Sequence, residues 1–172
     1  MFLEEGLGKE NKEETSEKKK KQRSVSQANV LCLIGDMRRD ETFYERAWEE
    51  SGQKCARAMR SLGRQQFYKG NFAASVESFN KGLAINRLYK DAWFTCGCAH
   101  MRLEQWEKAI FAFGNVVSID EHQVEAWGNI ANCYAVQEKM KEALACTEQA
   151  LKYNRRNWMI WHNCIRYSLS TN

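Results

Sequence analysis

Apolar residues recur with helical spacing along most of the chain. In residues 40–52, DETFYERAWEESG, the side chains of Phe43, Tyr44, Ala47 and Trp48 fall on one face of a helix. The alternating pattern typical of β-strands is missing, and the chain contains no proline that would interrupt a helix. The hydrophobic pattern therefore predicts an all-α fold.

The same pattern returns with a fixed period. Trp93, Trp127 and Trp161 are each 34 residues apart. A fixed period between about 20 and 50 residues indicates stacked structural repeats. Other columns in the same register are Gly63, Gly97 and Ala131; Phe72, Trp106 and Met140; Phe79 and Phe113; and Ala109 and Ala143.

The period divides the chain into segments. We expect a disordered, charged tail because the first residues are poor in apolar side chains and rich in Glu, Lys and Ser. The predicted boundaries are 1–27 for this tail, 28–55 for a degenerate helix pair, 56–89, 90–123 and 124–157 for three repeats, and 158–172 for the first helix of a truncated fourth repeat.

The repeat units resemble the tetratricopeptide repeat. One unit reads Trp93-x-x-Cys96-Gly97-x-x-His100 and then Ala109-x-x-x-Phe113. The next unit reads Trp127-x-x-Ile130-Ala131-x-x-Tyr134 and then Ala143-x-x-x-Thr147, and the first carries Leu62, Gly63 and Phe79 at the matching places. The resemblance implies a solenoid in which each unit forms two antiparallel helices, A and B, wound into a right-handed superhelix.

The chain departs from the family pattern at one position. Arg87, Glu121 and Arg155 stand where the family has a proline late in each unit, so we expect looser turns between units. The segments LCLIGD, FYERAWEESG and RSLGRQQFYKGNF also resemble one eukaryotic branch of the family, whose members are much longer. We therefore expect this chain to be a fragment.

The resemblance also implies a binding face, because the family's concave groove is lined by helix A. Arg57, Arg60 and Arg64 share one stripe of the first helix A, where their charges repel one another unless anions meet them. Phe94 and Met101 would anchor a peptide or a helix of another protein. We expect this ligand to carry acidic groups where it meets the arginines. The predicted groove residues are Arg57, Arg60, Arg64, Phe94, Cys98, Met101, Asn132, His162 and Arg166.

The stretch CGCAH at 96–100 has the residue types of a metal or redox site. In the repeat register, however, Cys96 faces the core and Cys98 points away from it, so they do not converge with enough ligands for zinc. The other histidines, His122 and His162, do not cluster with a nucleophile. We therefore expect no catalytic site, no metal and no cofactor, and we interpret the seven cysteines as reduced thiols.

Charge and hydropathy indicate which kinds of partner and which cellular location to expect. The net charge of +4 is too small to argue for nucleic acid by itself. No secretory signal opens the chain, and its longest apolar run, at 30–34, is too short to cross a bilayer. We expect no membrane and no small-molecule substrate, and a cytoplasmic protein in which the lysine run at 18–23 is a candidate nuclear signal.

Two alternatives to a peptide-binding scaffold remain open. One is RNA binding through the Arg and Lys surfaces, although Asp91 and Glu125 interrupt the basic stripe. The other is capture of an acidic chaperone C-terminus by a two-carboxylate clamp. The clamp positions hold Arg60, which fits, and Arg64, Thr95, Glu125 and Asn129, which do not.

Overall fold

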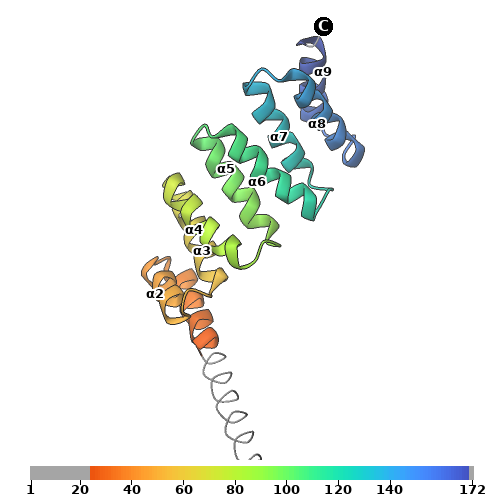
Figure 1. Cartoon of the computed structure of the whole chain (residues 1–172). Helices are drawn as coiled ribbons and strands as arrows, with labels where there is room; N and C mark the ends of the chain where they lie inside the picture. The colour runs from red at the N-terminus through yellow and green to blue at the C-terminus, as the bar shows by residue number, and fades with distance from the viewer. Residues whose placement is uncertain (1–23, 171–172) are drawn as a thin grey trace, which may run out of the picture.

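The computed structural model describes residues 24–170, and within that range it contains helices and turns but no strands (Figure 1). A helix over 24–38 is followed by α2 (Thr42–Glu50), α3 (Ala56–Tyr68), α4 (Phe72–Ile85), α5 (Lys90–Arg102), α6 (Trp106–Ile119), α7 (Val124–Val136), α8 (Met140–Tyr153) and α9 (Trp158–Ser170). The all-α prediction is confirmed. Residues 24–27, assigned to the tail from sequence, are helical, while the lysine run lies outside the described residues.

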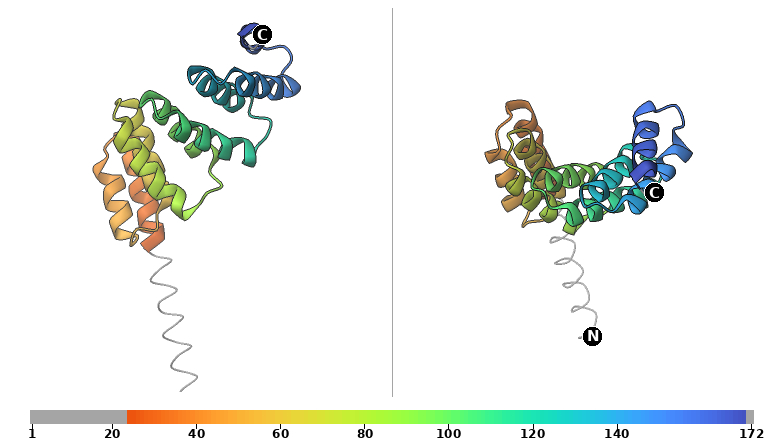
Figure 2. Two further views of the ribbon diagram at one scale, coloured as in Figure 1. Left: turned by 45° about the horizontal axis from the view of Figure 1, so that its top comes forward. Right: turned by 90° about the horizontal axis from the view of Figure 1, so that it is seen from above.

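The helices pack in sequence order as antiparallel hairpins. Each helix A contacts its own helix B, in the pairs α3–α4, α5–α6 and α7–α8, and each helix B contacts the helix A that follows. Seen from above, the hairpins follow a curve from α2 to α9 (Figure 2). α3 also contacts α5 directly. The arrangement is a helical repeat solenoid.

Close contact within each hairpin depends on a small residue in helix A. A Cβ atom added to Gly97 would lie 2.8 Å from the ring of Phe113 in α6, and one added to Gly63 would lie 3.1 Å from the ring of Phe79. Phe113 is completely buried, and burial of such a side chain stabilises the fold by about 1.5–3 kcal/mol. The third hairpin has Ala131 and Thr147 at the matching positions, and both are buried.

Gly97→Ala should destabilise the chain, whereas Gly114→Ala should stabilise it. Both glycines lie inside helices, where alanine is favoured by about 0.5–1 kcal/mol. A Cβ at Gly114 meets nothing within 4 Å, but a Cβ at Gly97 lies 2.8 Å from the Phe113 ring, which is too close, and such overpacking costs about 1–3 kcal/mol. Urea unfolding of both variants tests this. Equal effects of the two substitutions would contradict it.

The turn inside each hairpin needs a residue in the left-handed conformation. Gly70 has φ = 83°, and the matching residues of the next two hairpins are Glu104, with φ = 57°, and Glu138, with φ = 61°. Asn71 stands at the N-cap of α4, as its position suggests, but its side chain makes no capping hydrogen bond. The second and third turns therefore carry a backbone strain that the first avoids.

Glu104→Gly should raise the free energy of unfolding. The left-handed conformation costs a non-glycine residue about 1–2 kcal/mol, and the added freedom of glycine in the unfolded chain takes back about 0.5–1 kcal/mol. The expected gain is about 0.5–1 kcal/mol in urea unfolding. Gly70→Ala is the reciprocal control and should lose a similar amount; a Glu104→Gly variant less stable than the parent chain would overturn this account.

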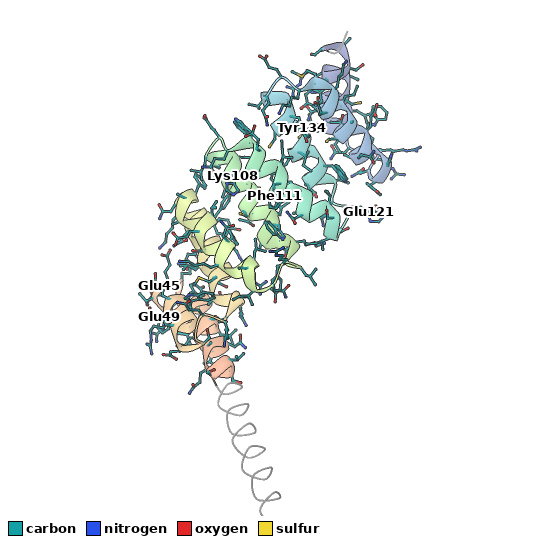
Figure 3. The ribbon with its side chains drawn as sticks, viewed as in Figure 1. Glu45, Glu49, Lys108, Phe111, Glu121 and Tyr134 are labelled. Atoms are coloured by element: carbon teal, nitrogen blue, oxygen red, sulfur yellow. The ribbon has the colours of Figure 1, made fainter. Side chains whose placement is uncertain are left out.

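The turns between units are held by two hydrogen bonds that recur in every unit. The side-chain oxygens of Asn86, Asp120 and Asn154 accept the backbone N–H two residues later, at 2.9, 3.2 and 3.2 Å. The indole Nε1 of Trp93, Trp127 and Trp161 donates to the carbonyls of Arg87, Glu121 and Arg155, at 2.8, 2.9 and 2.8 Å. Figure 3 marks Glu121 in one of these turns. The residues that replace proline are thus fixed through their carbonyls, and the expectation of looser turns is not supported.

The last described helix leaves an apolar surface uncovered. α9 packs on α8 through the buried Ile160 and Tyr167. Trp158 is 72% exposed, and Ile165 and Leu169 are exposed beside it. Ile165 occupies the register position of Gly63, Gly97 and Ala131, so a helix B packed there would need a smaller residue than Phe113.

Candidate peptide-binding face

Two of the three arginines on α3 are held by other parts of the chain. The Arg57 guanidinium lies 3.1 Å from a carboxylate oxygen of Asp36 in the helix over 24–38. The Arg60 guanidinium lies over the Tyr89 ring, 3.3 Å from its centroid, and burial lowers the pKa of Arg60. The predicted repulsion along the stripe is therefore relieved by an anion and an aromatic ring from neighbouring segments.

Arg64 is exposed and lines a cavity of about 600 Å³ between α3 and the preceding helix pair. We call it the joint cavity. Its lining is Asp36, Arg39, Tyr44, Ser61, Arg64, Gln65, Tyr68 and Lys69. The Tyr44 hydroxyl donates to Asp36 at 2.8 Å, and burial, together with this carboxylate, raises the pKa of Tyr44.

The joint cavity was missed by sequence reasoning. Three of its eight lining residues, Asp36, Arg39 and Tyr44, come from segments outside the 34-residue register and have no equivalent position in it. Lys69 lies 2.8 Å from Glu41, so its charge is partly compensated. The signal that was available is compositional: Arg38 and Arg39 lie in the short connection before the second helix.

The apolar groove residues of α5 are less available than expected. Phe94, Cys98 and Met101 are half-buried and pack against the central core. The Phe94 ring meets the Phe113 ring edge to face, with centroids 5.4 Å apart. Phe94 also lines a cavity of about 330 Å³ whose wall includes Lys90, Asp91, Thr95, Gln123 and Glu125. This second cavity carries two carboxylates, so the basic character of α3 does not continue along the face.

The other predicted groove residues are exposed. Asn132 lies on α7, and His162 and Arg166 lie on α9. The Arg166 guanidinium is 4.9 Å from the centroid of the Tyr167 ring and donates to its hydroxyl. These three residues are separated from the α3 arginines by the intervening units, so they do not form one compact site with them.

The structural positions of the repeat fall into three groups by burial. The buried group contains Leu62, Gly63, Phe79, Gly97, Ala109, Phe113, Ala131 and Ala143. The half-buried group contains Trp93, Trp106, Trp127 and Tyr134. Trp161 is exposed because no helix covers that side of α9 in the described part of the chain.

The CGCAH stretch lies inside α5, where Cys96, Gly97 and His100 are buried and pack in the core. Cys96 is buried, which raises the pKa of its thiol to about 12, so it is not a ready nucleophile. His100 is buried, and its Nδ1 lies 2.9 Å from the Gln105 amide oxygen. Within residues 24–170 no three His, Cys, Asp or Glu side chains are placed to share a metal ion.

His100→Tyr should remove part of the pH dependence of stability. Burial lowers the pKa of His100, so the unfolded chain binds the proton more readily than the folded chain. Stability is therefore lost as pH falls below the ordinary imidazole pKa of about 6.5. Urea unfolding above and below that pH should show a smaller acid loss in His100→Tyr. His162→Gln, at an exposed site, should keep the parent chain's loss; the same acid loss in His100→Tyr would refute the assignment.

The fold and the repeat register define a class of protein. The sequence profile of the tetratricopeptide repeat matches residues 124–157. The chain belongs to the tetratricopeptide repeat proteins. Proteins of this class generally act as non-catalytic scaffolds for other proteins. No helix in the described part combines the length and the apolar character needed to span a membrane.

The chain is similar in sequence to parts of longer proteins from other organisms. The chain is 35% identical over 145 residues to the TPR repeat-containing protein C19B12.01 of Schizosaccharomyces pombe, covering 83% of this chain and 18% of the relative. It is 36% identical over 136 residues to the tetratricopeptide repeat protein 27 homolog of Dictyostelium discoideum, covering 79% and 16%. It thus spans less than a fifth of these relatives.

The fold also matches the first TPR of Spaghetti (RPAP3) bound to the HSP90 peptide SRMEEVD. The TM-score is 0.62, with 18% identity over 69% of this chain and 94% of that one. At this identity the likeness concerns the fold.

Proposed function

We propose that this chain is a non-catalytic scaffold that binds an acidic segment of another protein along its helix A face. The segment would enter at the joint cavity, where Arg64 is exposed and Arg39 and Lys69 stand in the same wall. The position of Arg64 carries the proposal. Arg57 and Arg60 already have partners in the chain, so an incoming carboxylate would meet Arg64 first.

The remainder of the face supports an extended ligand. Phe94 offers a half-buried ring beside the second cavity, and Lys90 lies in the same wall. Asp91 and Glu125 would favour a basic or neutral residue at that point. The ligand that fits best is therefore acidic where it meets α3 and less acidic where it meets α5 and α7. The RPAP3 repeat domain was solved with an acidic peptide, which is consistent with a peptide as the kind of ligand.

Arg64→Glu should abolish partner binding without unfolding the chain. Proteins captured by the parent chain are quantified by mass spectrometry beside those captured by the variant and by a charge-matched control, Lys141→Glu, at an exposed position of helix B. Partners that the control retains and Arg64→Glu loses should bind through acidic segments. Binding of overlapping peptides that tile each such partner identifies the segment. Partners retained equally by both variants would move the site away from Arg64.

The clamp for chaperone C-termini makes a different prediction. It depends on Arg60, whose guanidinium is committed to the Tyr89 ring, and the other clamp positions do not match. We therefore expect no micromolar binding of the peptide SRMEEVD in a fluorescence titration. Micromolar binding that requires the free C-terminal carboxylate and disappears in Arg60→Ala would favour the clamp.

A further inference from the structure

Two cysteines meet where the first helix pair joins the repeats. The Sγ atoms of Cys32, in the helix over 24–38, and Cys55, immediately before α3, are 3.8 Å apart. They are 23 positions apart in sequence and share a core with Tyr44, Ala47 and Ala58. The repeat register gives no reason for this pairing, because Cys32 lies outside the register altogether.

The surroundings of the two thiols are unequal. Cys55 occupies the N-cap position of α3, where the positive end of the helix dipole favours a thiolate. The contact with the Cys32 thiol lowers the pKa of Cys55, and the backbone N–H groups of Ala58 and Arg57 act in the same direction. The pKa of Cys32 is raised by that same contact and by burial. Because Cys55 stands at the helix N-terminus, it is the more acidic of the two thiols and the one that loses its proton more readily.

Access is unequal in the same sense. Cys55 retains 7% of its surface exposed, whereas Cys32 has none. A small oxidant therefore reaches Cys55 first. A disulfide needs an S–S distance of about 2.05 Å. The two sulfurs, now 3.8 Å apart, must therefore move closer by less than the length of one such bond, which a small side-chain rotation can supply. Burial instead raises the pKa of Cys96, Cys98, Cys133 and Cys146, which makes these thiols poorer nucleophiles.

We propose that Cys32 and Cys55 are a redox-active dithiol that hydrogen peroxide converts to a disulfide. The Cys55 thiolate attacks the peroxide, the O–O bond breaks, and Cys55 becomes a sulfenic acid while hydroxide leaves. The Cys32 sulfur then attacks the Cys55 sulfur, and the S–O bond breaks with loss of water as the Cys32 proton is taken up. The two thiols are oxidised by two electrons and the peroxide is reduced to water.

The disulfide would fasten the helix over 24–38 to the start of α3 and enclose α2 between them. Arg57, which pairs with Asp36, lies two residues after Cys55, and Asp36 lies four residues after Cys32. The joint cavity is lined from both sides of this junction. Oxidation therefore restrains the segment that forms one wall of that cavity, and it removes conformations from the unfolded chain, which stabilises the fold.

The reaction is tested on the full chain with hydrogen peroxide as the oxidant. Intact mass spectrometry should show the loss of two hydrogen atoms, and a non-reducing tryptic digest should join the peptides that contain Cys32 and Cys55. The melting temperature should rise on oxidation and return after dithiothreitol. A digest without this link, or with cysteines linked at random, would overturn the proposal, as would an oxidised chain that melts at the same temperature as the reduced chain.

Two variants separate the dithiol from general thiol oxidation. Cys32→Ser, whose hydroxyl can still donate a hydrogen bond to Cys55, should stop at the sulfenic acid of Cys55, which dimedone traps, and its melting temperature should not respond to peroxide. Cys98→Ser is the matched control and should still form the Cys32–Cys55 link, because Cys98 lies on α5. The link in the parent chain is read independently of either variant, so a variant that fails to fold does not remove the test. A sulfenic acid found on Cys98 in preference to Cys55 would also refute the assignment.

Discussion

The close approach of helix A and helix B at one small residue is the constraint on which the array depends. Phe113 is fully buried only because Gly97 leaves space for its ring, and Phe79 lies on Gly63 in the same way. When the helix A residue grows to Ala131, the facing position is Thr147 instead of phenylalanine. A larger helix A residue is thus matched by a smaller facing residue, in keeping with the close packing of a core.

A second contact transmits this geometry from one hairpin to the next. Each repeat tryptophan donates its indole N–H to the carbonyl of the residue that replaces the family's proline. Proline would fix the turn through its own ring; here the turn is fixed from the following helix instead. The tryptophan column thus has two functions, since it fills the space between units and also sets the path by which the chain enters each of them.

The 34-residue period was enough to predict the fold, because every unit buries equivalent positions. It was not enough to predict the candidate site. The partners of Arg57 and Arg60 are Asp36 and Tyr89, and neither follows from the helix A positions on which the groove was predicted. Spacing within one helix shows which arginines share a stripe, but only the packing of other segments against that stripe determines which of their charges are already satisfied.

The departures from the repeat pattern gather at one junction. The joint cavity and the Cys32–Cys55 pair both lie between the first helix pair and α3, where no periodic constraint applies. A periodic position must serve packing in every unit, so it has little freedom to acquire other chemistry. The degenerate pair lies outside the register and packs against α3, so its residues are free to carry charge and thiols. This is why the charged cavity and the cysteine pair lie at α3 and not at CGCAH, where Gly97 packs on the ring of Phe113 and Cys96 is buried in the core.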